Sequence, residues 1–232
     1  MRTRHVGWLC VVGAASLATS SALAQVGTAT FTWQASADGG QAWQSNLIEV
    51  DQSVRDLRVR GWLDWSANAG VAVETTSFDC IVQTESLSDQ ISEPYRPEPF
   101  SSFPPQSLAS TRFGNVIKID DVRDTLPPGV GIRGILIAQP WADSGFPHTD
   151  ERPLSLLEYS LRLSGELGDR TVSSEFLWLN SFDVRLWISR TGREGANAPL
   201  TTTVPLTIRV IPAPGAAAFM TLGMLAAARR RR

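Results

Sequence analysis

Apolar and polar residues alternate along most of the chain between residues 28 and 210, as in strands that bury one face. The alternation is cleanest over residues 157–164, where Leu157, Tyr159, Leu161 and Leu163 share one face. No segment before residue 212 shows the 3.6-residue period of an amphipathic helix. Strands are predicted over residues 28–33, 54–65, 71–75, 78–83, 115–119, 131–139, 157–164, 171–179, 182–189 and 206–210.

Prolines and glycines interrupt this alternation where turns and loops are expected. Five prolines between residues 94 and 105 predict a long surface loop over residues 92–107. Further loops are predicted over residues 141–153 and 192–199, and Pro205 predicts that the last strand begins at a sheet edge. Gly61 interrupts the strand over residues 54–65, where a bulge is expected. About ten strands without intervening helices predict an all-β fold, an antiparallel β-sandwich or jelly roll.

The N-terminal segment departs from the strand pattern. Arg2 and Arg4 precede an apolar run over residues 6–16, and Ala22 and Ala24 form a small-x-small cleavage site before Gln25. This is the layout of a secretory signal peptide, whose apolar part is helical. Residues 1–24 are therefore predicted to direct export and to be removed by cleavage.

The C-terminal segment also departs from the strand pattern. Residues 215–228 carry no charge and are followed by Arg229, Arg230, Arg231 and Arg232. A helix of that length covers about 21 Å, less than the roughly 30 Å of a bilayer core. The arginines are expected to stay cytoplasmic, so residues 215–228 are predicted to form a short transmembrane helix. A basic tail that binds nucleic acid is the alternative.

The motif that joins this segment to the last strand is Ile211, Pro212, Ala213, Pro214 and Gly215. Together with the apolar run and the arginine block, it resembles the PEP-CTERM sorting signal of exported proteins in diderm bacteria that make exopolysaccharide. Ile and Ala stand where the usual motif, Val-Pro-Glu-Pro, has Val and Glu. The resemblance implies that a membrane protease, exosortase, cuts near the motif. It implies an inner-membrane-anchored precursor and then a protein of the cell surface or extracellular matrix, but no molecular activity.

Between the two signals, residues 25–211 form a region of about 187 residues, a size that suits a single domain. Six arginines lie in the terminal segments, so the net charge falls from −2 for the whole chain to about −8 for this region. Such an acidic region argues against nucleic acid as a partner. Cys80 is the single cysteine left after signal cleavage and is predicted to be a buried thiol. Lys118 is the only lysine of the chain.

A short motif over residues 36–43 resembles the Asp box, Ser-x-Asp-x-Gly-x-x-Trp, known from sialidases and other β proteins. Its members here are Ser36, Asp38, Gly40 and Trp43. The carboxylate can accept backbone N–H groups within the turn, and the glycines allow positive φ. One copy predicts a stabilised hairpin and not a glycosidase.

Few residues are candidates for metal or catalytic chemistry, and no cofactor is predicted. Asp120, Asp121 and Asp124 are clustered carboxylates of the kind that calcium binds, but their spacing fits no calcium loop, and solvated turn carboxylates are expected instead. His148 is the only histidine after residue 24 and is expected in an exposed loop. No catalytic residue or metal ligand is predicted.

Three functions are compatible with these observations. The first is a non-catalytic protein of the cell envelope or extracellular matrix. The second is a carbohydrate-binding module or adhesin for exopolysaccharide, with Trp62 and Trp187 as candidate stacking platforms because they lie opposite the apolar faces of their strands. The third is a secreted glycosidase, which needs two carboxylates about 5–10 Å apart. The first is favoured, and the protein is not expected to be an enzyme.

Overall fold

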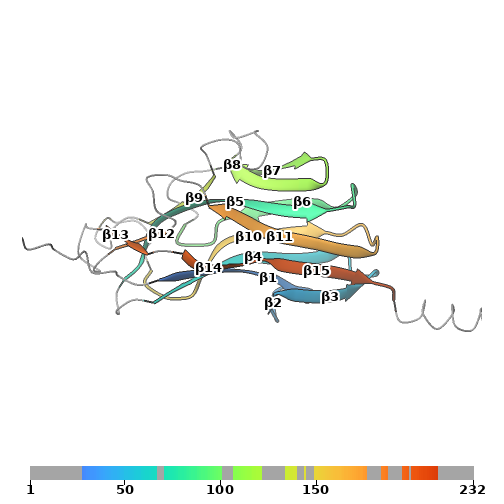
Figure 1. Ribbon diagram of the computed structural model, residues 1–232, viewed down its shortest axis with the longest axis horizontal. Helices are drawn as coiled ribbons and strands as arrows, with labels where there is room; N and C mark the ends of the chain where they lie inside the picture. The colour runs from blue at the N-terminus through green and yellow to red at the C-terminus, as the bar shows by residue number, and fades with distance from the viewer. Residues whose placement is uncertain are drawn as a thin grey trace, which may run out of the picture.

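The computed structural model describes residues 28–66, 71–100, 107–121, 134–139, 144, 149–176, 184–187, 195–198 and 200–213. Within these residues the chain forms fifteen strands in two sheets and no α-helix. The strands of both sheets run along the long axis of the molecule (Figure 1). Several predictions lie outside the described residues: the signal peptide with its cleavage site, Pro214 and Gly215, the helix over 215–228, the four terminal arginines, Asp124 and His148.

The first sheet, here called the six-strand sheet, has the strand order β14-β1-β4-β10-β6, with β2 paired to β1. Its central strands β1, β4 and β10 pair in antiparallel register. Its strands are β1 (Ala29–Ser36), β2 (Gln44–Ser45), β4 (Asp56–Trp65), β6 (Gln90–Tyr95), β10 (Leu154–Arg162) and β14 (Leu200–Val204).

The second sheet, here called the nine-strand sheet, has the order β13-β12-β5-β11-β15-β3; β8 and β9 also pair with β5, and β7 pairs with β8. Strand β5 pairs with β11 and β12 along one edge and with β8 and β9 along the other. The strands are β3 (Leu47–Asp51), β5 (Val73–Thr84), β7 (Leu108–Phe113), β8 (Val116–Asp121), β9 (Ile135–Ala138), β11 (Gly168–Phe176), β12 (Val184–Trp187), β13 (Gly195–Ala198) and β15 (Leu206–Ile211).

The inner faces of the two sheets pack together over an aromatic core, which confirms the predicted β-sandwich. Phe31 of β1 lies 5.1 Å from Phe78 of β5 and 5.4 Å from Phe176 of β11, measured between ring centroids. Trp33 Nε1 donates a hydrogen bond of 2.9 Å to Ser174 Oγ, so the buried indole satisfies its polar group across the sandwich. The core therefore joins β1 of one sheet to β5 and β11 of the other.

The alternation predicted for the most regular strands is confirmed. Leu157, Tyr159 and Leu161 are fully buried, and so is Cys80, whose Sγ lies 3.8 Å from the Tyr159 hydroxyl. Burial raises the pKa of the Cys80 thiol well above its usual range. The predicted buried, unreactive thiol is therefore confirmed.

The bulge expected at Gly61 lies in the neighbouring strand. Strand β10 has a register irregularity between Ser155 and Leu157, at the level of Gly61. Gly61 is needed for another reason: a Cβ there would lie 2.6 Å from Cζ of Phe31. The glycine thus leaves room for an aromatic ring of the core.

Two features of the topology differ from the purely antiparallel sandwich or jelly roll that was predicted. Strand β14 pairs with β1, and β15 with β3, in parallel register. Pro205 does not begin an edge strand, because β15 pairs with both β11 and β3. The proline instead lies where the chain passes from β14 in one sheet to β15 in the other.

Three of the predicted loops and strands also need correction. The prolines over residues 92–107 do not exclude a strand: β6 contains Pro94, which is tolerated because β6 ends the strand order of its sheet. Strand β13 lies within the predicted loop 192–199. The two short strands predicted over 71–75 and 78–83 are the single strand β5.

Candidate binding face

The Asp-box motif forms the tight turn that connects β1 to β2. Asp38 Oδ1 accepts hydrogen bonds from Ser36 Oγ at 2.5 Å, from the Gln41 N–H at 2.9 Å and from the Ala42 N–H at 3.0 Å. The hydrogen bond from Ser36, followed by the backbone bonds, holds the pKa of Asp38 below its usual range. The predicted hairpin is confirmed, and the turn fixes the position of Trp43, which follows it.

Trp43 and Trp62 enclose the guanidinium group of Arg60 on the outer face of the six-strand sheet. The Arg60 Cζ atom lies 4.0 Å from the ring centroid of Trp43 and 3.7 Å from that of Trp62. Both distances are well inside the range for cation–π attraction. Arg60 Nε also donates a hydrogen bond of 2.8 Å to Gln34 Oε1 on β1. Burial between the rings lowers the pKa of Arg60, and Glu158 opposes this effect.

A second set of contacts lies beside this stack. Arg58 Nη2 is 3.2 Å from Glu158 Oε2 and donates a hydrogen bond of 3.1 Å to the Tyr95 hydroxyl. The Tyr95 hydroxyl donates in turn to Glu158 Oε2 at 2.7 Å. Burial, followed by the nearby Glu158 carboxylate, raises the pKa of Tyr95. The three side chains form a closed network over strands β4, β10 and β6.

The strand register places these groups in one row across the sheet. Arg60 pairs with Gln34 of β1 and with Glu158 of β10, and Glu158 pairs with Tyr95 of β6. Strands in a sheet are about 4.8 Å apart, so the row of four strands extends over roughly 14 Å. The candidate binding face is defined here as this row together with Arg58, Trp43 and Trp62.

The two tryptophans proposed from the sequence have different environments. Trp62 is half-buried and lies on the candidate binding face, against Arg60. Trp187 was predicted to be a surface platform, and this is wrong: it is 9% exposed, and its Nε1 donates to the Gln139 carbonyl oxygen at 2.9 Å. Trp187 is a structural residue because β12 is covered on both faces at this point.

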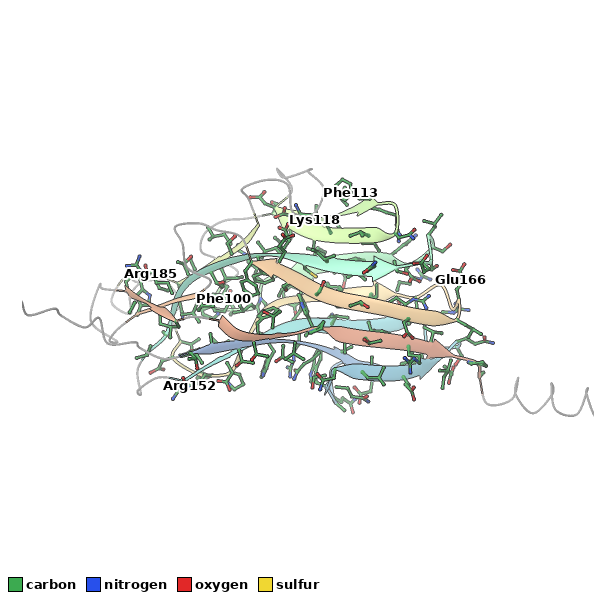
Figure 2. The ribbon with its side chains drawn as sticks, in the orientation of Figure 1. Phe100, Phe113, Lys118, Arg152, Glu166 and Arg185 are labelled. Carbon is green, nitrogen blue, oxygen red and sulfur yellow. The ribbon has the colours of Figure 1, made fainter. Side chains whose placement is uncertain are left out.

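A further group of charges on the nine-strand sheet is buried. Its centre is Lys118 of β8, which is labelled in Figure 2. Lys118 Nζ lies 2.6 Å from Asp120 Oδ2 and 3.3 Å from Asp79 Oδ2, and each of the three side chains is at most 4% exposed. Burial raises the pKa of Asp120 to about 7, although the hydrogen bond from Lys118 opposes this. The prediction that Asp120 and Asp121 are solvated turn carboxylates is wrong, since both are buried in β8.

At one end of the sandwich, Asp89 and Arg170 form a second buried ion pair, with Arg170 Nε 2.8 Å from Asp89 Oδ2. Thr84 Oγ1 and the Ser164 N–H also donate to the Asp89 carboxylate, at 2.6 Å and 2.8 Å. Burial opposes ionisation of Asp89, but these bonds outweigh it and lower its pKa. Through Asp89, these contacts join the segment that follows β5 to β11 and to the segment that follows β10. A nearby open hollow of about 440 Å³ is lined by Arg55, Ser88, Gln90, Arg162, Leu163 and Ser164.

The candidate binding face has one carboxylate in its row, Glu158, which is engaged by Arg58 and Tyr95. Over the part of the chain that the structure describes, no group of three or more His, Cys, Asp or Glu side chains is arranged to hold a metal ion. No helix among the described residues has the length and apolar character needed to cross a membrane.

No protein-family model matches the chain, and no curated protein matches it. Solved structures that resemble it include cohesins. A non-cellulosomal cohesin from Archaeoglobus fulgidus is 10% identical and covers 83% of this chain and 97% of its own, with a TM-score of 0.37. The seventh ScaB type I cohesin from Pseudobacteroides cellulosolvens is 6% identical, covers 72% and 89%, and has a TM-score of 0.42.

A type I cohesin–dockerin complex from Clostridium thermocellum is also similar, at 9% identity and a TM-score of 0.42, with 79% of this chain and 99% of the other covered. At this level of similarity, none of these structures assigns a partner or a function to this chain.

The sequence indicated some members of the candidate binding face and not others. Alternation in β4 placed Arg58, Arg60 and Trp62 on an outward face, and the Asp-box motif marked Trp43. The contact between Trp43 and the side chains of β4 was not predicted, because it depends on the pairing of β1 with β4. Tyr95 was missed because the prolines around it suggested a loop.

Proposed function

We propose that this chain is an exported, non-catalytic protein of the bacterial cell envelope or extracellular matrix that binds polysaccharide through the candidate binding face. The observation that carries the proposal is the Trp43–Arg60–Trp62 stack beside a row of polar side chains. Its members come from a turn and from four different strands, so the arrangement is rigidly positioned by the sheet. Such preorganisation reduces the entropy lost on binding.

The chemistry of the face suits a sugar chain. Aromatic rings provide a flat apolar surface with low conformational entropy, on which the C–H faces of sugars can pack. Gln34, Arg58 and Glu158 supply a donor-and-acceptor amide, a planar cation and a carboxylate for hydroxyl groups. A row of roughly 14 Å across the strands offers contacts to several consecutive sugar units.

Delivery to the cell surface is the second part of the proposal. Strand β15 ends at Ile211, whose carbonyl oxygen accepts a hydrogen bond of 2.9 Å from the Gln52 N–H, and Pro212 follows directly. The sorting motif thus begins at the last residue of β15, a position that would suit recognition by a membrane protease. We propose that exosortase cuts there, after the signal peptide has been removed.

Binding is tested with exopolysaccharide purified from the producing organism and with a panel of soluble neutral polysaccharides. The Trp43→Ala and Trp62→Ala variants are each expected to weaken binding about tenfold, which corresponds to about 1.4 kcal/mol. Leu167→Ala, at a side chain that is 55% exposed away from the face, is the control for loss of exposed apolar surface and should bind normally. Arg60→Ala should also lower the affinity for the polysaccharide, whereas its control Arg209→Ala, on the other sheet, should not. Equal affinity of the face variants and the controls would contradict the proposal.

The non-catalytic part is tested on the same polysaccharides. Hydrolysis of any of them that disappears in Glu158→Gln, with the fold retained, would show that the protein is a glycosidase.

Sorting is tested separately by the intact mass of the protein recovered from its host. A species that begins at Gln25 and ends within residues 211–215 is expected. A mature species that keeps Arg229 to Arg232 would exclude cleavage at the motif without affecting the binding proposal.

A further inference from the structure

We infer that Lys118 and Asp79 are joined by an intramolecular isopeptide bond between β8 and β5, and that Asp120 transfers the proton that its formation requires. The inference rests on the positions of three buried side chains on the outer face of the nine-strand sheet. It does not depend on the function proposed above.

The three side chains meet because of the pairing of two strands. Ile119 of β8 pairs with Cys80 of β5, so Lys118 and Asp120 lie on either side of the position opposite Cys80. Side chains at alternate positions share a face, and Asp79 is the diagonal neighbour of Lys118 on that face. The sheet therefore brings the carboxyl group of Asp79 from β5 to the amine of Lys118 and the carboxyl group of Asp120, which lie together on β8.

The two contacts of the amine differ in a way that assigns the roles. The 2.6 Å distance from Lys118 Nζ to Asp120 Oδ2 is that of a strong hydrogen bond. The 3.3 Å distance from Lys118 Nζ to Asp79 Oδ2 is longer than a normal charge-assisted bond, so Asp79 holds the amine less tightly while its carboxyl group stays in contact with the nitrogen. Asp79 is thus the carboxyl group that is placed for attack, and Asp120 the one placed to exchange protons with the amine.

Burial favours the uncharged forms that the reaction needs. The exposed fractions of the three side chains are 2% for Lys118, 2% for Asp79 and 4% for Asp120. Isolated charges are strongly disfavoured in such surroundings. Counted over these three side chains, an ammonium, one carboxylate and one carboxylic acid carry no net charge, and transfer of one proton converts them into a neutral amine and two carboxylic acids.

The reaction balances without an oxidant or another reactant. The Nζ lone pair forms a C–N bond to Cγ of Asp79, and the C–OH bond of that carboxyl group breaks. Asp120 takes a proton from the nitrogen and passes one to the departing hydroxyl, which leaves as water. One amine and one carboxylic acid become one amide and one water, and Asp120 is regenerated.

Such a bond would link residues that lie far apart in the sequence, and it would do so in a domain with no disulfide. Cys80 is the one cysteine within the described residues, and it is free. A cross-link between β5 and β8 restricts the unfolded chain as a disulfide does.

The test is mass spectrometry of the purified, denatured protein. The wild-type protein is expected to weigh less than its sequence by one water. Trypsin cleaves at arginines that put Asp79 and Lys118 in separate peptides, which should be recovered as one branched species. Because Lys118 is the only lysine, the side-chain amine that forms the amide is unambiguous. An intact wild-type mass equal to that of the sequence would overturn the inference.

Three variants test the roles. Lys118→Arg and Asp120→Asn should both restore the full calculated mass, the first because the nucleophile is gone and the second because the proton carrier is gone. Asp169→Asn, at an exposed carboxylate that pairs with Arg209 on the same sheet, is the control and should retain the loss of water. Fragmentation that places the amide on Asp120 instead of Asp79 would overturn the assigned roles.

The test does not depend on whether the variants fold, because the mass of the wild-type protein alone shows whether the amide is present. A second readout is the reaction of the denatured wild-type protein with an amine-specific reagent. Lys118 should remain unmodified, and its modification would contradict the inference.

Discussion

On the six-strand sheet, Arg60 lies between two indole rings on an outer face whose aromatic and polar groups remain partly exposed. On the nine-strand sheet, Lys118 also projects outward from its strand, yet it is 2% exposed and is held between two buried carboxyl groups. Both cations follow the same alternation of apolar and polar positions. The comparison shows that alternation determines the side of a sheet on which a residue lies, whereas the layers packed outside determine whether that side meets water.

The largest expected effect is on the free energy of unfolding, when Lys118 of the buried face is replaced. Lys118→Met removes the side chain that joins β8 to Asp79 and contacts Asp120, and it leaves two buried carboxyl groups together without the lysine. Removing one member of a buried polar cluster in this way typically destabilises a protein by about 3–5 kcal/mol. The free energy of unfolding from urea titration should fall by that amount, and a change below about 1 kcal/mol would mean that this face is as open as the other.

The two tryptophans sharpen the same contrast. Trp187→Ala should destabilise the fold by about 3–5 kcal/mol, because it empties a buried site. Trp62→Ala removes a partly exposed cation–π contact and should cost only about 0.5–1 kcal/mol. Thermal unfolding of both variants checks this ordering. If Trp62→Ala were the more destabilising change, Trp62 would be a core residue and not part of a binding face.

Two buried carboxyl groups should respond to pH in opposite directions. The pKa of Asp120 is raised from 3.8 to about 7, so the folded state binds the extra proton and this group makes stability fall as the pH rises between about 4 and about 7. The pKa of Asp89 is lowered, so its contribution is present above its unfolded pKa and is lost as the pH falls through its folded value.

Urea unfolding midpoints measured between about pH 2 and about pH 8 separate the two effects, because Asp89 acts below about pH 4 and Asp120 above it. Asp120→Asn should remove the fall between about pH 4 and pH 7. A slope in that range identical to the wild-type slope would show that Asp120 ionises normally.

The smallest effect is expected at the edge of the candidate binding face. Arg58→Ala removes a partly exposed ion pair but leaves the 2.7 Å hydrogen bond between Tyr95 and Glu158. The free energy of unfolding should fall by about 0.2–1 kcal/mol. A loss of several kcal/mol would indicate that the Arg58 network supports the sheet itself.

The sequence predicted β1, β4 and β10, whose outer faces are open, but it missed β3 and β7 and misjudged the buried charges of β8. Strands β1, β4 and β10 alternate cleanly because one face of each meets water. Strand β8 carries Asp120 and Asp121, which suggested a solvated turn, although strand pairing and a lysine two residues before Asp120 keep the charges buried. The prediction that Trp187 lies on the surface failed for the same reason. A side chain opposite the apolar face of a strand is exposed only if nothing packs against that side.

Proline was the other source of error, because its meaning depends on the position of a strand within its sheet. Pro94 occupies an edge strand, where a missing N–H does little harm, and Pro205 marks the passage between sheets. Neither position is readable from local sequence. The candidate binding face was likewise indicated only in pieces, since its row is assembled by the pairing of four strands.

The arrangement of β15 has a mechanical consequence. This strand is bonded along one edge to β11 and along the other to β3, and it ends at Ile211. A pull applied to the chain beyond Ile211 acts along the axis of β15. The hydrogen bonds to both neighbours are then loaded together in shear instead of being opened one at a time. A domain pulled from this end would resist the force better than a domain whose last strand lies at a sheet edge, where its hydrogen bonds can open one after another.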